Sequence, residues 1–239
     1  MIVMCRAISV MTYEIVVSRY REPLTWTTEP LFSKHTYTVY NKGGDSAFVH
    51  DRVDNVISLP NVGKDVHTYL YHVVTNYDAL SDITVFTPAS LDVWYKRDKA
   101  ATLFHTLESV NFATAVFLGE CCSSVRDRFA NYVQDVWVPS TAENRAAYTG
   151  DSRMWVSPLR PFSRWYEHHF GDQVAEWWSY NNTFAIAKED VLQYPKSRYE
   201  RLLEGLSVAN DVEEAHYVER SWNAIFGPFR ATAVLPYRM

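Results

Sequence analysis

The residues best suited to chemistry gather in one segment near the carboxyl end of the chain. Asp211, Glu213 and Glu214 precede His216 there, so carboxylates and an imidazole stand within about two helical turns. Carboxylates can take a proton from a reacting hydroxyl, and a histidine can bind a metal ion. An ordinary amphipathic helix explains the same residues, because an acidic first turn is favoured by the helix dipole and Asp211 can cap it.

Polar residues also follow the strands that the sequence predicts. A cation and backbone amides at a helix start can hold a diphosphate, and an aromatic ring can stack on a base. Arg19 and Lys64 could equally be solvated surface charges. Their common position after strands favours a site for a phosphorylated, oxygen-rich ligand, formed by Ser18, Arg19, Tyr20, Asn41, Lys42, Asn61, Gly63 and Lys64.

A divalent metal ion is the third feature that the sequence suggests. Ser90 and Asp92 stand just past a predicted central strand, where a carboxylate could bind an ion that bridges two phosphates. Mg²⁺ or Mn²⁺ needs few protein ligands, so Asp92 and His216 with the phosphates of the ligand would suffice. Asp92 could instead cap the following turn, and His216 could be a polar face residue.

The elements that must position these residues alternate along the chain. Apolar runs rich in β-branched residues predict strands at 13–20, 35–44, 82–90, 114–122 and 182–188. Helical spacing predicts helices within 59–80, 100–110, 196–206 and 210–229, and the last of these buries a stripe of Ala215, Val218, Trp222 and Ile225. The pattern predicts an α/β fold with a central mixed sheet flanked by helices, and a ligand crevice where loops after Val17, Val39, Phe86 and Phe117 converge. Residues 126–176 read as loops and short helices over that crevice.

Composition limits the classes of protein. The 239 residues include 23 basic and 28 acidic side chains, and the net charge of −5 gives no broad basic surface for nucleic acid. Three cysteines, two of them adjacent, suggest neither a disulfide framework nor a zinc site. We expect a single domain over 13–239, with 1–12 as a leader or extension, no transmembrane segment, and a cytoplasmic location.

A family resemblance joins these features. No P-loop, GxGxxG, HExxH or GxSxG motif is present. The chain instead resembles the small GT-A-type glycosyltransferases of large chlorella viruses and a related fungal domain family without assigned function, from about Tyr13 to Phe229. The motifs that carry the likeness are EIVVSRYRE-LTW, YNKG, LPNVGKDVHTYLYHVV, ITVFTPAS, PLRPFSRWY, NTFAIAKEDVLQYP and AHYVERSWNAIF.

The resemblance implies a UDP-sugar donor, Mn²⁺ or Mg²⁺ as cofactor, and a glycan or glycoprotein acceptor, with viral capsid glycans made in the host cytoplasm. Ser18 to Tyr20 look like the nucleotide-gripping loop of the family. Asp92 falls where GT-A enzymes carry a DxD metal motif, although Ser90 replaces the first acid. Asp211 looks like the base of an inverting enzyme, and Glu213 and Glu214 are the alternatives to it.

We therefore expect a metal-assisted glycosyltransferase that moves a sugar from a UDP-sugar to an acceptor hydroxyl. A different class of protein also fits the altered metal motif, namely a non-catalytic carbohydrate-binding or capsid-associated protein with a degenerate transferase fold. Metal-dependent binding of UDP separates these two hypotheses. A metal-dependent hydrolase would need ligands grouped more closely than the sequence shows between 211 and 219.

Overall fold

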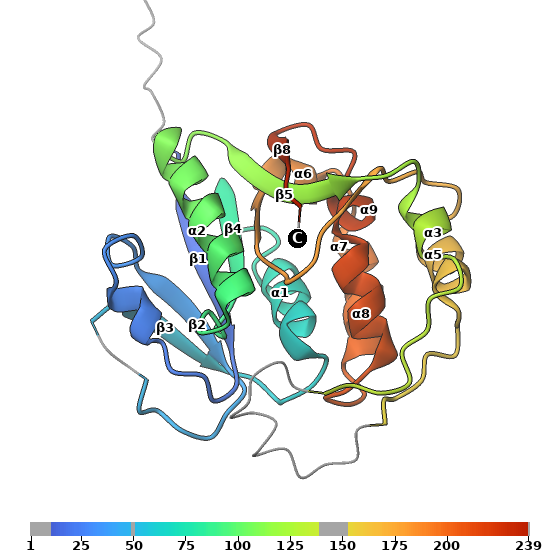
Figure 1. Ribbon diagram of the computed structural model, residues 1–239, viewed down its shortest axis with the longest axis horizontal. Helices are drawn as coiled ribbons and strands as arrows, with labels where there is room; N and C mark the ends of the chain where they lie inside the picture. Colours follow the sequence, from blue (N-terminus) through green and yellow to red (C-terminus); the bar gives the residue numbers. More distant parts are fainter. Residues whose placement is uncertain (1–10, 49–50, 139–152, 239) are drawn as a thin grey trace, which may run out of the picture.

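A five-stranded mixed sheet forms the centre of the protein, in the order β3-β2-β1-β4-β7. The computed structural model describes residues 11–48, 51–138 and 153–238. The strands of this sheet are β1 (Tyr13–Arg19), β2 (Tyr37–Asn41), β3 (Val53–Ser58), β4 (Ile83–Pro88) and β7 (Phe184–Ala187). The sheet with helices on both sides confirms the predicted fold class (Figure 1).

Strand direction places the carboxyl ends of four strands along one edge. β1 pairs in parallel with β2 and with β4, and β2 pairs in parallel with β3. β7 alone runs antiparallel to its neighbour in this sheet, β4. Loops that leave β1, β2 and β4 therefore meet at one edge, as the bases of ligand crevices do in α/β folds.

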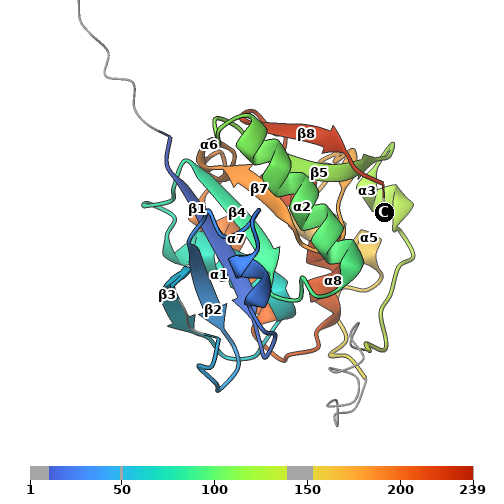
Figure 2. The same ribbon diagram turned by 60° about the vertical axis from the view of Figure 1, so that its left-hand side comes forward.

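The helices cover both faces of the sheet because successive strand residues point to opposite sides. Val16 packs into the core on one face, and Ile15 and Val17 pack into the core on the other. The first face is covered by α1 (Lys64–Thr75), α7 (Lys196–Leu206), α8 (Glu213–Arg220) and α9 (Trp222–Phe226). The second is covered by α2 (Trp94–Ser109) and the short 3-10 helix η1 (Thr25–Thr28), and Figure 2 shows α2 crossing in front of the sheet.

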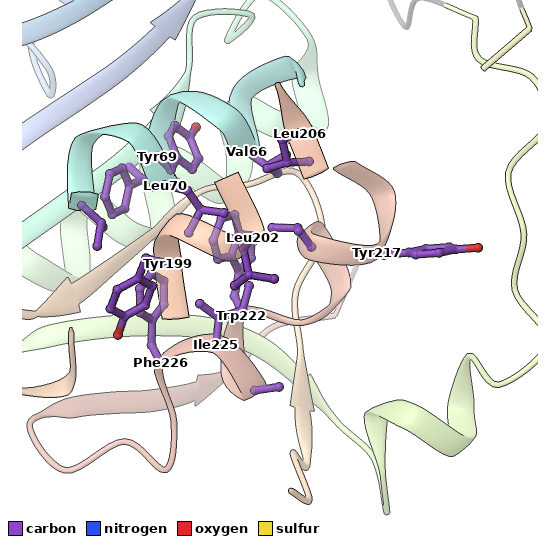
Figure 3. Close-up of a cluster of buried hydrophobic side chains, with 14 of the residues drawn as sticks. Val66, Tyr69, Leu70, Tyr199, Leu202, Leu206, Tyr217, Trp222, Ile225 and Phe226 are labelled. Atoms are coloured by element: carbon purple, nitrogen blue, oxygen red, sulfur yellow. The ribbon is translucent and has the colours of Figure 1, made fainter. Parts of the chain in front are cut away.

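Aromatic side chains fill the core beneath α1, α7, α8 and α9 (Figure 3). The rings of Trp222 and Phe226 stack at 5.7 Å between centroids, and those of Tyr69 and Phe86 stack at 4.7 Å. Such rings each bury a large apolar area, so they fix α8 and α9 firmly against the sheet. The predicted stripe of Ala215, Val218, Trp222 and Ile225 is buried and is confirmed.

A second, three-stranded sheet, β6-β5-β8, lies beside the first. Its strands are β5 (Ala115–Cys121), β6 (Trp177–Trp178) and β8 (Thr232–Pro236), and the remaining helices are α3 (Val125–Arg128), α5 (Phe162–Phe170) and α6 (Lys188–Leu192). Among the helices in the described ranges, none is long and apolar enough to span a bilayer.

Several local predictions differ from the structure. The sequence did not predict β3, an edge strand whose side chains are mostly exposed, or β8. α2 begins at Trp94, earlier than expected, because Lys99 occupies a buried position and hides the apolar stripe of the helix. Asp211 does not cap α8, whose N-cap is Val212. Residues 1–10 of the expected leader lie outside the described residues.

Candidate functional site

A cavity of about 480 Å³ opens at the carboxyl edge of the central sheet. Loops after β1, β2 and β4 form its floor, and the starts of α1 and α2, one face of α8 and the segment before β7 form its walls. The charged side chains that line it are Arg19, Arg21, Glu22, Lys42, Lys64, Asp65, Lys96 and Glu219. The predicted convergence of loops is confirmed for these three strands, but no residue of the loop after β5 lines the cavity.

The cavity brings together most of the predicted site residues. Those that line it are Ser18, Arg19, Tyr20, Lys42, Asn61, Lys64, Ser90 and His216. Six predicted residues do not line it, namely Asn41, Gly63, Asp92, Asp211, Glu213 and Glu214. Several of these, among them Asn41 and Gly63, hold the cavity walls in place.

Arg19 organises the loops after β1 and β2. Its guanidinium donates to the carbonyl of Glu22 at 2.8 Å, to Asn41 Oδ1 at 2.9 Å and to Asp45 Oδ1 at 2.8 Å. It also lies over the ring of Phe48, at 3.8 Å from the ring centroid. A side chain with this many protein partners has few donors left for a ligand, so Arg19 and Asn41 act mainly by shaping the wall.

An unusual backbone conformation sets the start of α1. Gly63 and Lys64 both have left-handed φ angles, 55° and 51°. The Gly63 amide donates to the carbonyl of Ala209 at 2.8 Å, and a Cβ at Gly63 would stand 2.5 Å from the carbonyl of Leu206. Only glycine fits there, so Gly63 is needed to join α1 to the segment before α8.

Lys64 is held on one side of the cavity by an acid and an aromatic ring. Its ammonium forms an ion pair with Asp211 and stands 3.2 Å from the centroid of the Trp137 ring. A non-glycine residue at positive φ is strained, and such strain is tolerated where the surroundings fix it. Burial lowers the pKa of Lys64, while Asp211 acts in the opposite direction.

Lys42 is a buried cation held by carbonyl groups. Its Nζ donates to the Val62 carbonyl at 2.6 Å and to the Lys64 carbonyl. Burial lowers its pKa to about 7; nearby Asp65 opposes this shift and Lys64 adds to it. The cavity therefore contains an amine whose charge is poorly stabilised by the protein alone.

Glu219 is the carboxylate of α8 that lines the cavity. It is 9% exposed, and Oε1 accepts a hydrogen bond from the Asn181 amide at 3.0 Å. Burial raises the pKa of Glu219 to about 7, Arg220 opposes the shift, Asp65 adds to it, and Lys96 lowers it slightly. A carboxylate that titrates near neutral pH is suited to proton transfer.

The segment before β7 forms another wall of the cavity. Lys99 Nζ holds it through Ser179 Oγ at 2.5 Å and through the carbonyl of Tyr180. Asn181 and Asn182 adopt left-handed φ angles of 66° and 45°, which asparagine tolerates better than most residues. Asn182 also accepts hydrogen bonds from Trp222 Nε1 at 2.8 Å and Tyr69 OH at 3.0 Å, so this wall is rigidly attached to the aromatic core.

The predicted metal site is not assembled by the described side chains. Asp92 is exposed and lies outside the cavity lining, whereas His216 lines the cavity. Burial lowers the pKa of His216 to about 3, and its Nε2 has no hydrogen-bond partner among the described residues. Within 11–48, 51–138 and 153–238, no three His, Cys, Asp or Glu side chains are grouped to hold a metal ion. The structure therefore does not bring Asp92 and His216 together as the expected site for Mn²⁺ or Mg²⁺ requires.

The three predicted carboxylates have different surroundings. Asp211 adjoins the cavity through its ion pair with Lys64. Glu213 is fully buried and accepts from the amides of Gln134 and Ser157, each at 2.9 Å, so it anchors loops. Glu214 lines a separate cavity of about 310 Å³. Of the three, Asp211 alone contacts a side chain that lines the main cavity, namely Lys64.

Sequence reasoning missed several residues that line the cavity, chiefly Asp65, Tyr95, Lys96, Tyr180 and Glu219. The sequence contained a signal for one of them, Glu219. Glu219 follows His216 by three positions, so a helix that turns His216 into a cavity turns Glu219 the same way. Lys96 had no such signal, because the start of α2 read as a polar loop.

Comparison with known proteins shows the family but no activity. The chain belongs to the family described as "Protein of unknown function (DUF3431)", whose model matches residues 15–234. That description names neither a virus nor a glycan. No curated protein matches the chain in sequence. Among solved structures, CMP:2-keto-3-deoxy-manno-octonic acid synthetase complexed with CTP is similar at 14% identity over 94% of this chain and 90% of that chain, with a TM-score of 0.33.

Proposed function

We propose that this member of the DUF3431 family is a glycosyltransferase that binds a UDP-sugar in the main cavity and transfers the sugar to a hydroxyl of a glycan acceptor. The observation that carries the proposal is the meeting of lysines, aromatic rings and one carboxylate with a raised pKa at the carboxyl edge of a largely parallel sheet. Ligands of α/β folds bind at that edge. The motif resemblance supports the choice of a sugar nucleotide.

The donor would bind with its diphosphate toward the start of α1. Lys42 and Lys64 lie there, and the backbone amides of the first helical turn favour negative charge. Tyr20, after β1, offers a ring on which the base can stack. A cavity of about 480 Å³ is within the range of small-molecule sites, roughly 300–1,000 Å³.

Glu219 is our first candidate for the general base, and Asp211 is the second. Glu219 would take the proton of the acceptor hydroxyl while that oxygen bonds to the anomeric carbon and UDP leaves with the electrons of the broken bond. A single displacement of this kind inverts the anomeric centre. Asp211 is less suitable because its carboxylate is already engaged in an ion pair with Lys64.

The test has a binding step and a transfer step. Calorimetric titration with UDP, GDP and CMP should show binding of UDP, and an array of glycans with UDP-sugars should reveal a product by mass spectrometry. Glu219→Gln should lower kcat about 100-fold or more with an unchanged Kd for UDP, because a general base contributes about 10²–10⁴ to the rate.

Two further variants make this test specific. Asp211→Asn should reduce turnover less than Glu219→Gln does. Glu214→Gln is the matched control, since Glu214 lies on the same helix but lines the separate cavity. Normal turnover in the Glu219 variant with loss in the Asp211 variant would reassign the base to Asp211. UDP binding without transfer to any glycan would favour the carbohydrate-binding alternative.

A further inference from the structure

The main cavity contains several cations, and the described residues group no three metal-binding side chains beside them. Lys42, Lys64 and Lys96 line it, while the described part of the chain holds no group of three metal-binding side chains. The leaving diphosphate of a sugar nucleotide carries negative charge that something must neutralise. The cavity is also lined by Arg21 and by Arg19, whose guanidinium is engaged with protein partners, and the three lysines supply the ammonium groups for this task.

We propose that the ammonium groups of Lys42, Lys64 and Lys96 neutralise the bound diphosphate, so that the donor binds without a divalent metal ion. This inference rests on the proposed function, since it concerns the donor of that reaction. It replaces the expected metal ion with residues of the chain itself.

The three lysines reach the cavity from both faces of the sheet. Lys42 follows β2 and Lys64 begins α1, on one face. Lys96 belongs to α2, which covers the opposite face, and its Nζ lies 2.7 Å from Ser90 Oγ, just after β4. A diphosphate over the carboxyl edge of β1 and β4 would therefore meet cations on two sides. This is the kind of clamp that a metal ion otherwise supplies to two phosphates.

Lys42 carries the strongest part of the argument. It is 8% exposed, and the hydrogen bonds given to its Nζ by the described residues go to carbonyl oxygens, not to a carboxylate. A buried cation without a paired acid is costly. An incoming phosphate would supply the missing negative charge, so part of the cost of burying Lys42 is recovered when the donor binds.

Binding of the diphosphate beside Lys42 should be accompanied by uptake of a proton. Burial holds the pKa of Lys42 at about 7 in the free protein, and the charged groups that act on it, Asp65 and Lys64, come from α1. A diphosphate beside the amine favours its charged form and raises the pKa. At about pH 8 the free amine is largely neutral, so binding should take up a proton.

The experiment is calorimetry of UDP binding at about pH 8, in EDTA and in Mn²⁺, using two buffers that differ in ionisation enthalpy. We expect UDP to bind in EDTA with a Kd within about two-fold of that in Mn²⁺, and the heats in the two buffers to show proton uptake. Lys42→Met should weaken UDP binding about ten-fold or more and abolish most of the uptake.

Two controls keep the interpretation specific. Uridine lacks phosphates, so its affinity should not change in the Lys42 variant. Lys34→Met removes an exposed lysine paired with Glu108 and should leave UDP binding unchanged. If Lys42→Met does not fold, Lys96→Met serves in its place, because Lys96 is less buried.

The failure of this inference can be distinguished from failure of the proposed function. Binding of UDP in Mn²⁺ but not in EDTA would overturn the lysine clamp and leave the transferase proposal standing. Unchanged UDP affinity in both the Lys42 and Lys96 variants would also overturn the clamp. No binding of any nucleotide, with or without metal, would overturn the proposed function and the inference together.

Discussion

Glu219 makes the stability of this protein depend on pH in a direction opposite to that of most acidic residues. Burial raises its pKa to about 7 from the ordinary value of 4.5. Between these two values the folded state holds a proton that the unfolded state has lost. The contribution of Glu219 to stability is therefore fully present below about pH 4.5 and is lost as the pH rises through about 7.

The perturbation that isolates this effect is Glu219→Gln, which keeps the shape of the side chain and removes its ionisation. Each unit of pKa difference corresponds to about 1.4 kcal/mol. From the two pKa values, the folded state with glutamate loses roughly 2–3 kcal/mol relative to the glutamine variant between about pH 5 and about pH 8. Lys42, whose pKa burial lowers to about 7, is present in both proteins and cancels in the difference. Burial also lowers the pKa of Lys99 to about 7 and Glu219 opposes that shift, so loss of Glu219 lowers the pKa of Lys99 further and widens the gap in the same direction.

Urea unfolding of the natural protein and the variant across this pH range measures the difference directly. The gap in the free energy of unfolding should widen in favour of glutamine as the pH rises from about 4.5, and it should level off above about pH 7. A gap that stays constant with pH would show that Glu219 titrates as an ordinary exposed acid. That result would refute the raised pKa of Glu219 and the choice of Glu219 as the general base.

Two further predictions concern residues that hold the cavity walls. Gly63→Ala should destabilise the protein by roughly 2–4 kcal/mol, because the new Cβ would meet the carbonyl of Leu206 at a positive φ. Thermal unfolding measures this loss. The control is Gly44→Ala, whose Cβ would meet nothing within 4 Å and should change stability by about 0.5 kcal/mol at most. Glu213→Gln should cost roughly 2–4 kcal/mol, because its amide would face the Gln134 and Ser157 amides that now donate to the carboxylate. Urea unfolding beside Glu214→Gln checks this, and equal losses in the two variants would show that Glu213 is not the anchor.

The sequence predicts the strands of the central sheet that are buried on both faces. β1 and β4 are continuous apolar runs with β-branched residues, and the structure buries nearly all of their side chains. β3 could not be recognised in this way, because an edge strand with exposed side chains has neither a run nor an alternation. Its position depends on backbone pairing with β2, which local sequence does not encode.

The sequence predicts the site residues that follow strands, but it does not predict the site residues that helices supply. Ser18, Lys42 and Ser90 were found because strand ends meet at one edge of the sheet. Lys96 was missed because Lys99, a buried lysine, breaks the apolar pattern of α2 and made its first turns read as a loop. Lys99 is buried because it anchors the wall before β7, a long-range role that spacing along one helix cannot reveal.

The raised pKa of Glu219 and the lowered pKa of Lys42 share one cause, which is burial in the same cavity. An anionic ligand acts on both in one direction, since it favours the charged amine and disfavours the charged carboxylate. A diphosphate beside Glu219 would therefore protonate the base that the reaction needs. The donor can avoid this only if its phosphates lie toward Lys42 and Lys64 at the start of α1, with the sugar and the acceptor hydroxyl toward Glu219. The charges that line the cavity thus favour one orientation of the donor, and the reverse orientation would leave the general base neutral at the pH where the lysines bind phosphate.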